Sequence, residues 1–381
     1  MPEARPEKLR VLIAGGGIAA LETTLALSDL AGDRVALTLL APDDEFVYRP
    51  LTVREPFAYS RADRYPLASV LAGTGAEQVS DKLDWVEPDR LLVHTEGGTA
   101  LQYDALVLAL GATLYPRYEH AITIDDRRMD EALHGLIQDI EQGYLESVAF
   151  VAPGRMAWPL PIYELALMTA GRAYDMGVPL ASTIVTPEDK PLAAFGQEVS
   201  DGVAALLAGK GIRTIASAYA EIPAPGEVVI NPGDRRVRAQ RVVALPELYG
   251  PSVRGLRVSE HGFVAVDPFC RVPGAGPVFA AGDAVDFPIK QGGIGSQQAD
   301  VAAESIAKLA GAEIEPHPFN PVIHGVLLTD GRPRYIAAKI TGGHGFASHF
   351  SEKPIDGVTQ KVAARYLAPR VEQLNRGGVA A

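Results

Sequence analysis

LRVLIAGGGIAA, residues 9–20, is the stretch of sequence that decides the fold. Its first half is a short apolar run, typical of a parallel strand buried on both faces. Three glycines follow this run directly, and an apolar helical pattern over 18–30 follows the glycines. Strand, glycine turn and helix in this order let a helix N-terminus bind a pyrophosphate. Gly15 would permit the tight turn, Gly17 would let the backbone approach the phosphates, and Ala20 replaces the third glycine.

The same pattern continues outward along the chain. Residues 35–42, VALTLLAP, predict the second strand of a strand–helix–strand unit with a right-handed crossover. Ala41 ends this strand, where dinucleotide folds usually carry an acid for a ribose hydroxyl, so Asp43 or Asp44 would have to substitute. A second strand–helix–strand pattern begins near Ser147, which predicts a second dinucleotide-type domain. Further strands are expected at 105–110, 147–152, 181–186 and 277–281, helices at 163–174 and 196–209, and turn-rich connections over 221–235.

Two later strands also end at a glycine. They are YDALVLALGA, residues 103–112, and PVFAAGDA, residues 277–284. In the second, Gly282 is followed by Asp283, whose carboxylate would accept hydrogen bonds from a polyol at the end of a buried strand. The alternative for Asp283 is a capping role at the next helix.

Charge and cysteine content exclude several classes of protein. The chain has 35 Lys and Arg against 47 Asp and Glu, a formal net charge of −12. Such an acidic surface argues against nucleic acid and against anionic lipid as partners. Cys270 is the single cysteine, so no internal disulfide or redox dithiol can form. The N-terminus is unlike a signal peptide, and no apolar run reaches the roughly 20 residues that span a bilayer. We expect a cytoplasmic protein without membrane contact.

The three glycine-ended strands, in this order, resemble the flavin disulfide-reductase superfamily, the pyridine nucleotide-disulphide oxidoreductase-like fold with two dinucleotide domains. Within it, residues 9–310 are most similar to the branch of sulfide:quinone oxidoreductases, flavocytochrome c sulfide dehydrogenases and type II NADH dehydrogenases. The resemblance implies FAD as the cofactor. It implies pyrophosphate binding at Gly15 and Gly17, and contact of Asp283 with the ribityl chain or pyrophosphate.

The resemblance also implies which other segments line the cofactor. The segment matching Leu83 passes the adenine, and Ala109–Gly111 closes over the cofactor. Arg49, within Tyr48-Arg49-Pro50, matches the loop near the isoalloxazine or pyrophosphate. Residues 288–299, PIKQGGIGSQQA, match the stretch that leads into a helix whose N-terminus points at the flavin. The implied cofactor-binding set is Gly15, Gly17, Ala20, Arg49, Leu83, Ala109, Gly111, Gly282, Asp283 and Gln291.

Departures from the family pattern bear on the reaction. The turn after the strand at 147–152 reads PGRMAWPLP, with one glycine among prolines and bulky side chains where a nicotinamide cofactor would need a glycine-rich turn. Glu188 after the next strand is the candidate ribose ligand there. We interpret the NAD(P)H site as degraded. In the sulfide-oxidising branch a cysteine stands at the position of Trp158, so chemistry by a cysteine pair is excluded; Cys270 is interpreted as a small buried hydrophobe.

Three residues are candidates for catalysis. Trp158 would stack on the flavin or shape a substrate pocket, or it is a core aromatic. Glu164, in the Tyr163-Glu164 pair that matches the sulfide-oxidising branch, would relay protons, or it is a helix N-terminal acid. Lys290 would stabilise negative charge at the flavin, or it is a solvated lysine. His344 and His349 are interpreted as loop histidines, and no metal site is expected because no third ligand is apparent.

The fold class expected is α/β, with two Rossmann-like domains of the three-layer ββα type and a small C-terminal segment. The FAD-binding domain would comprise 1–115 and 250–320, the NAD(P)-binding-like domain 116–249, and the C-terminal interface segment 321–381. Within that segment, residues 361–374 have some apolar periodicity, which favours a helix packed on its own domain or on a second subunit of a homodimer.

The function expected is an FAD-dependent oxidoreductase that passes two electrons through the flavin to or from a small molecule, with a quinone as candidate partner. Three alternatives stay open. They are an NAD(P)H dehydrogenase with an unusual loop, a flavin-binding redox-sensing module without turnover, and a reductase for a ferredoxin-like protein, which would need a basic docking patch.

Overall fold

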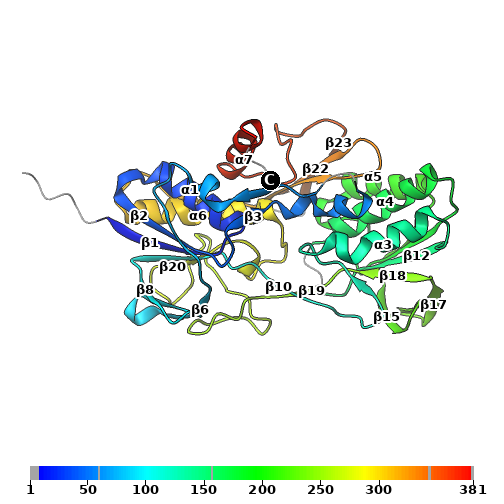
Figure 1. Ribbon diagram of the computed structural model, residues 1–381, viewed down its shortest axis with the longest axis horizontal. Helices are drawn as coiled ribbons and strands as arrows, with labels where there is room; N and C mark the ends of the chain where they lie inside the picture. The colour runs from blue at the N-terminus through cyan, green and yellow to red at the C-terminus, as the bar shows by residue number, and fades with distance from the viewer. Residues whose placement is uncertain (1–7, 59–60, 156–157, 342–344, 379–381) are drawn as a thin grey trace, which may run out of the picture.

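The computed structural model describes residues 8–58, 61–155, 158–341 and 345–378, which form two α/β lobes side by side (Figure 1). One lobe is built mainly from the start of the chain and from the segment around 250–310, and the other from the middle of the chain. The chain crosses from one to the other and returns along β10 (Thr113–Tyr115) and β19 (Glu247–Tyr249), which pair antiparallel between the lobes. The expectation of two dinucleotide-type folds is confirmed.

The first lobe is centred on a five-stranded sheet whose strands are all parallel. Helices α1 (Ile18–Leu30) and α6 (Gly292–Leu309) cover one face, and a smaller antiparallel sheet covers the other. The apolar side chains of each parallel strand pack on both faces of the sheet, because neighbouring side chains point to opposite sides. The parallel order is β20 (Val278–Ala280), β9 (Ala105–Leu108), β1 (Leu9–Ala14), β2 (Val35–Leu40) and β5 (Glu77–Val79); the covering sheet is β6 (Leu83–Glu87), β7 (Leu92–Thr95) and β8 (Ala100–Gln102).

The second lobe repeats the plan. Its sheet is again five-stranded and parallel, with helices on one side and a three-stranded antiparallel sheet on the other. The order is β11 (Ile122–Thr123), β18 (Arg241–Ala244), β12 (Ser147–Val151), β13 (Ala181–Val185) and β14 (Arg213–Ile215). The helices are α3 (Met129–Glu141), α4 (Leu160–Asp175) and α5 (Gln197–Gly209). The three-layer ββα class is therefore confirmed for both lobes.

The sequence-based interpretation of one connection is wrong. The segment 221–235 was expected to be turn-rich, but it lies in the antiparallel sheet of β15 (Tyr219–Ala224), β16 (Glu227–Asn231) and β17 (Arg235–Arg238). Its glycines Gly226 and Gly233 have positive φ and make the two hairpin turns. Alternate residues such as Val228 and Ile230 are buried against the parallel sheet. The prolines and glycines in this stretch mark turns between short strands rather than an irregular loop.

The remainder of the chain crosses both lobes. Strands β21 (Val322–Leu327), β22 (Arg334–Thr341) and β23 (Gly345–Ser351) form an antiparallel sheet beside α5. Helix α7 (Leu367–Arg376) packs on α1 and on α2 (Leu67–Leu71). The helix expected over 361–374 thus begins six residues later, with Pro369 in its first turn, where an imino nitrogen is tolerated. The short pair β3 (Glu45–Val47) and β4 (Arg64–Pro66) completes the strands.

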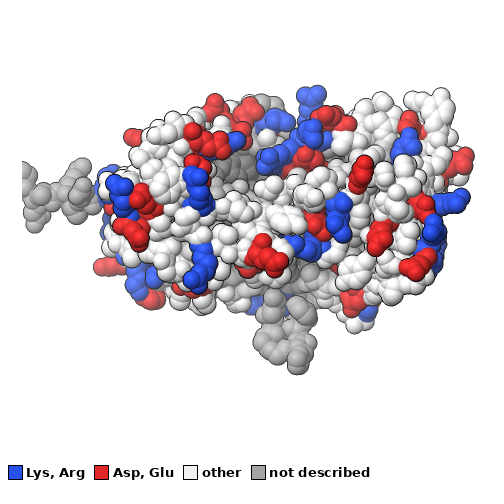
Figure 2. Space-filling view, turned by 90° about the horizontal axis from the view of Figure 1, so that it is seen from below, with Lys and Arg blue, Asp and Glu red and all other residues white. Residues whose placement is uncertain are grey.

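The other expected elements agree closely with the structure. The helix over 18–30 is confirmed to the residue, and α4 begins three residues before the expected start. Within the described part of the chain, no helix is both long and apolar enough to cross a membrane. Lysine and arginine side chains alternate with acidic ones over the face seen from below (Figure 2).

Candidate functional site

The candidate site lies at the carboxyl edge of the first parallel sheet, where β1, β9 and β20 end. Gly15 follows β1 with φ +130°, and a Cβ added there would lie 2.2 Å from the carbonyl oxygen of Ala109, which follows β9. Its N–H donates to Leu40 O at 2.8 Å. Only glycine therefore fits where the two strand ends approach each other.

Helix α1 begins with free backbone donors. Gly17 is its N-cap, and no side chain caps the first turn. A Cβ added at Gly17 would meet no atom within 4 Å, so the space in front of the helix is open. Ala20 is fully buried against the sheet, in the packing position expected of a third glycine. Free N–H groups, the positive end of the helix dipole and open space are what an anion requires.

The N-terminal end of α6 lies against that of α1. Three glycines and an alanine allow this approach. A Cβ at Gly292 would lie 2.8 Å from Ile18 Cδ1, and one at Gly295 would lie 3.0 Å from Gly282 Cα. A Cβ at Gly282, which has φ +78°, would lie 3.0 Å from the Ala19 methyl, and the Gly282 N–H donates to Gln298 Oε1 at 2.9 Å. Two helix N-termini therefore converge beside the strand ends.

Gln291 has an internal role. Its Oε1 accepts from Ile294 N at 3.2 Å, which caps α6, and its Nε2 donates to His324 O at 2.7 Å. The amide group is buried and engaged at both ends. Gln291 thus fixes the start of α6 next to β21, the strand that contains His324.

Asp283 and Lys290 are two titratable groups beside this edge, and each acts electrostatically on the other. Asp283 lies in the 3-10 turn Gly282–Ala284 and caps no helix, so the capping alternative is wrong. Burial raises the pKa of its carboxyl to about 6; the Lys290 charge lowers this pKa and the Asp126 charge raises it. Lys290 is 7% exposed, donates to Val285 O and lies 3.8 Å from the centre of the Phe263 ring. The solvated-lysine alternative is therefore wrong.

Burial also changes the charge state of that lysine. It lowers the pKa of Lys290 to about 8, against the opposing effect of Asp283 and Asp286. A lysine that titrates near neutrality can be present in either protonation state at the site.

Arg49 connects this edge to the second lobe. It begins the 3-10 segment Arg49–Phe57, and its Nη1 lies 3.2 Å from Asp126 Oδ1. The same Asp126 acts electrostatically on Asp283, so Arg49 belongs to the same charged neighbourhood. Gly111, with φ +73°, turns the chain after β9.

Leu83 lies in the covering sheet of the first lobe and not in its parallel sheet. It begins β6 and pairs with Thr95 in the covering sheet. The strand next to β2 is β5, and Ala41 N donates to Val79 O at 3.0 Å. Asp44 Oδ1 accepts from Gln78 and from Ser80, both at 3.1 Å. The end of β5 was missed, because three residues without periodicity carry no strand signal.

In the second lobe, Glu188 follows β13, where a ribose ligand would stand. Its carboxylate is already engaged: the Tyr163 hydroxyl donates to Oε2 at 2.6 Å, Thr186 Oγ1 donates at 3.2 Å, and Ala193 N donates to Oε1 at 3.1 Å. Burial raises the pKa of Glu188. The chain's own groups thus engage both oxygens of the Glu188 carboxylate.

The N-terminus of α4 is also poorly suited to an anion. Pro159 is its N-cap and Pro161 stands at its second position, so one first-turn N–H is missing. Trp158 is half-buried, and its ring lies 5.6 Å from that of Phe195 at 56°. Trp158 packs against the core of the second lobe, as the core-aromatic alternative holds.

Glu164 is fully buried on α4 and paired with a residue from the C-terminal segment. Lys361 Nζ lies 2.7 Å from Glu164 Oε2, and Leu328 N donates to Oε1 at 2.8 Å. Burial raises the pKa of Glu164 and lowers that of Lys361, and each group opposes the shift of the other. Glu164 stands in the second turn of α4, so the first-turn-acid alternative is wrong.

This ion pair is adjacent to the edge of the first sheet. Val362 N donates to the buried Tyr48 hydroxyl at 3.0 Å, one residue before Arg49. The Val362 side chain lies 3.0 Å from the Cβ position of Gly292 at the start of α6. Lys361 therefore reaches from the N-terminus of α6 to the second lobe. Sequence reasoning missed Lys361, because 197 residues separate it from Glu164.

Other sequence candidates lie away from this edge. Cys270 is buried, and burial raises the pKa of its thiol to about 12, which confirms the interpretation as a small hydrophobe. His349 is exposed on β23 and pairs in register with Ala337, so it is a strand residue and not a loop residue. His344 lies outside the described residues. No group of three metal-ligating side chains occurs among the residues that the structure describes.

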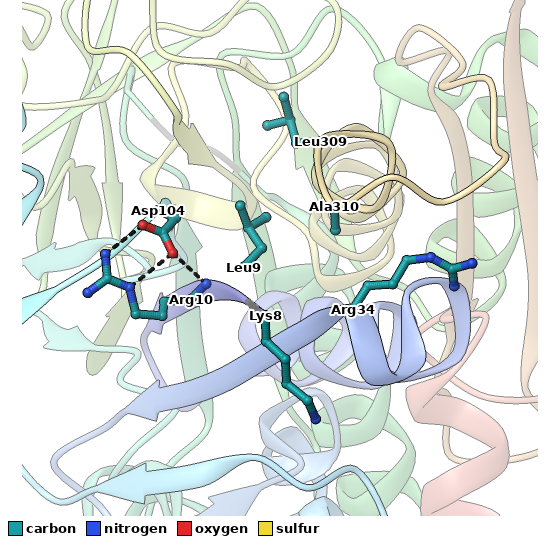
Figure 3. Close-up of a pocket in the computed structure, with 7 residues that line it drawn as sticks. All are labelled: Lys8, Leu9, Arg10, Arg34, Asp104, Leu309 and Ala310. Atoms are coloured by element: carbon teal, nitrogen blue, oxygen red, sulfur yellow. Dashed lines mark hydrogen bonds and ion pairs between the residues drawn. The ribbon is translucent and has the colours of Figure 1, made fainter. Parts of the chain in front are cut away.

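A cavity of about 280 Å³ opens at the opposite edge of the first sheet (Figure 3). There the side chains of Arg10 and Asp104 face each other, with Arg10 Nε 2.9 Å from Asp104 Oδ2. Since β1 begins at Leu9 and ends at Ala14, this cavity is separated from the glycine turns by the length of the strand. It is not part of the candidate site.

No family model matches the chain. Among curated proteins, a sulfide-quinone reductase of Aquifex aeolicus is 25% identical over 261 residues, which is 64% of this chain and 59% of that protein. A mitochondrial sulfide:quinone oxidoreductase of Dictyostelium discoideum is 27% identical over 107 residues, 28% of this chain and 24% of its own. The chain thus spans about three fifths or less of the length of the curated relatives it matches.

Solved structures agree in fold. The sulfide:quinone oxidoreductase of Aquifex aeolicus superposes with a TM-score of 0.79 at 21% identity, over 91% of this chain and 87% of that one. NDH2 of Plasmodium falciparum gives 0.68 at 12% identity, over 87% and 90%. At these identities the structural likeness concerns the fold alone. Together, the comparisons confirm the resemblance to the FAD-dependent pyridine nucleotide-disulfide oxidoreductases, with sulfide:quinone oxidoreductases among the relatives.

Proposed function

We propose that the chain is an FAD-dependent oxidoreductase that passes two electrons through the flavin, with a quinone as one small-molecule partner and without a cysteine pair. The observation that carries the proposal is the convergence of the α1 and α6 N-termini on open space beside Gly17. The quinone is proposed because the distant relatives of this chain are a sulfide-quinone reductase and a sulfide:quinone oxidoreductase. We also propose that 1–115 and 250–320 form the FAD-binding domain, 116–249 the second domain, and 321–381 the C-terminal interface segment.

The residues at the sheet edge fit a dinucleotide. The free first-turn donors of α1, opened by Gly15 and Gly17, would hold the pyrophosphate. Asp283 would accept a hydrogen bond from a ribityl hydroxyl, and Arg49 would face the phosphates or the ring. The start of α6, capped by Gln291, would direct its positive dipole end towards negative charge on the flavin ring. The end of β5, rather than Leu83, is the strand end beside the Ala41 loop.

FAD, when bound, supplies the two-electron chemistry. Reduction of a quinone also takes up protons, and a side chain placed beside the site can deliver them. Glu164 and Lys361 are suited to proton delivery, because both are buried, both have pKa values shifted towards neutrality, and Lys361 lies one residue from the contact with α6. Glu164 would receive a proton at Oε2 from the Lys361 ammonium and pass it on, and one proton taken up from solvent by the Lys361 amine would restore the charged pair.

The second lobe argues against NAD(P)H as the electron donor. A ribose at Glu188 would have to displace the Tyr163 and Thr186 hydroxyls, and Pro161 removes a backbone donor from the adjoining helix. A donor other than a pyridine nucleotide is therefore part of the proposal.

The test is a stopped-flow experiment on the flavin-loaded protein. Under anaerobic conditions the flavin is reduced with dithionite, and its reoxidation by a short-chain ubiquinone analogue is followed. E164Q should slow reoxidation about 10²–10⁴-fold, the range for loss of a general acid. E260Q, a matched change at an exposed glutamate, should behave like the wild type. Equal rates for E164Q and wild type, no reoxidation by the quinone, or bleaching by NADH within seconds would each overturn a part of the proposal.

A further inference from the structure

The C-terminal helix is fastened to the first lobe by a buried carboxylate. Helix α7 lies over α1 (Figure 1), with Leu367, Val371 and Leu374 buried beneath it. At its start, Glu22 of α1 accepts from Tyr366 N at 2.9 Å and from Leu367 N at 2.6 Å. Glu22 is fully buried, so this carboxylate replaces the side-chain N-cap that α7 lacks.

A second carboxyl group faces the first. Asp300, on the neighbouring helix α6, makes a side-chain hydrogen bond to Glu22. Its Oδ1 is buried and has no hydrogen-bond partner among the described residues. Because the backbone N–H groups that Glu22 accepts favour its ionised form, we assign the hydrogen of the Asp300–Glu22 contact to Asp300. Two carboxyl groups in hydrogen-bond contact cannot both be ionised, so the geometry requires one proton.

The other charged and titratable groups around the pair come from three elements. Asp29 of α1 faces the Tyr366 hydroxyl. Glu304 of α6 lies close to Asp300 and is itself 3.3 Å from His317 Nδ1. Arg365, just before α7, is the cation that acts on Asp300. The carboxylates of Glu22 and Glu304 thus oppose ionisation of Asp300, and one guanidinium favours it.

We propose that the proton shared between Asp300 and Glu22 is a pH-sensitive latch: it holds the segment 361–376 on α1 and α6, and its loss at alkaline pH releases that segment. The segment also carries Lys361 to Glu164 and Val362 to Tyr48, so release would withdraw both contacts from the sheet edge. The proton of the latch lies on the carboxyl pair, and the latch does not require a flavin.

The direction of the pH effect follows from proton binding. Burial and the Glu22 charge raise the pKa of Asp300 to about 8, and burial raises that of Glu22. The docked state therefore holds a proton on the Asp300–Glu22 pair that the released state gives up. A raised carboxyl pKa contributes stability at low pH that is lost as the pH rises towards the raised value. Docking should weaken from about pH 5 to pH 8 and then level off.

The test is hydrogen exchange of the full chain, read by mass spectrometry on peptides that cover 361–376. With exchange corrected for its intrinsic pH dependence, protection at Tyr366 and Leu367 should fall by up to about tenfold per pH unit between pH 5 and 8, the limit for one proton. D300N keeps a neutral donor to Glu22, so its protection should fall less steeply with pH than that of the wild type, because only the Lys361–Glu164 pair still titrates between the segment and the second lobe. E372Q, a matched change on the exposed face of α7, should follow the wild type.

Two outcomes would overturn the latch: protection that falls equally in D300N and wild type, or protection in the wild type that does not change with pH. Peptides of β12 report global unfolding and separate it from local release. Infrared difference spectra of the wild type give a second measurement, should D300N fail to fold. A protonated carboxyl band present at pH 6 and lost by pH 9 supports the latch, and its absence at pH 6 contradicts it.

Discussion

Replacing Gly17 by aspartate should separate folding from cofactor binding. Gly17 is the N-cap of α1 with φ −92° and ψ −170°, an extended conformation that any residue adopts. Aspartate is a preferred N-cap, and its charge interacts favourably with the helix dipole. Because no atom lies within 4 Å of the added Cβ, the new side chain meets no obstacle. G17D should therefore keep or raise the free energy of unfolding of the apoprotein by about 0.5 kcal/mol.

The same carboxylate should abolish FAD binding. It would take the first-turn N–H groups of α1 for itself and put a negative charge beside the pyrophosphate. At about 5 Å and an effective dielectric constant of about 20, one pair of like charges costs about 3 kcal/mol, more than a hundredfold in affinity. G17N adds a side chain of the same size without the charge, and should lose less affinity than G17D.

Gly15 provides the opposite control. A Cβ there would lie 2.2 Å from the Ala109 carbonyl oxygen, at a backbone φ of +130°. Strained backbone and overpacking together should cost G15A about 2–5 kcal/mol of stability. Urea unfolding of the apoproteins and quenching of FAD fluorescence measure the two quantities. The reasoning is refuted if G17D binds FAD like the wild type, or if G15A is as stable as the wild type.

Two further predictions concern buried pairs of the second lobe. K361M leaves the Glu164 carboxylate without its cation. The free energy of unfolding should fall by about 3–5 kcal/mol at pH 8, and by less at pH 5, where Glu164 can bind a proton. Urea unfolding at both pH values measures this loss, and an equal loss at both would contradict the prediction. Y163F removes a donor to Glu188, whose pKa is already raised by burial, so it should cost about 1–3 kcal/mol at pH 8 and less at pH 5. Thermal melting of Y163F and wild type between pH 5 and pH 8 measures this difference in stability. Y163F should also leave the protein as unreactive towards NADH as the wild type.

Local pattern predicted most of the parallel sheets. A buried strand that ends at glycine and is followed by an apolar helix carries its own signal, and α1 was located to the residue. Short antiparallel strands such as those within 221–235 carry little signal, because their burial depends on the sheet beneath them. The start of α7 depends equally on tertiary contacts, since the Glu22 carboxylate and not a local residue caps it.

The residues of the candidate site also fall into those that local sequence pattern reveals and those that only tertiary contacts reveal. The places of Gly15, Gly17 and Asp283 at the ends of buried strands are recognisable from the sequence, because they depend on the adjoining strand and helix. Lys361 is not, since its role depends on a contact across 197 residues. The engagement of Glu188 is also invisible in the sequence, where it stands at an ordinary ribose position; only the fold brings the Tyr163 hydroxyl to its carboxylate.

The most direct test of the central claim is the visible spectrum and flavin content of the purified protein, after incubation with FAD and removal of the excess. The account predicts a flavin absorption band at close to one FAD per chain, lost in G17D, and not bleached by NADH or NADPH under anaerobic conditions. A colourless protein that takes up no FAD would contradict the account. A flavin band that NADH bleaches within seconds would support the claim that the chain binds FAD, but it would contradict the claim that the nicotinamide site is closed.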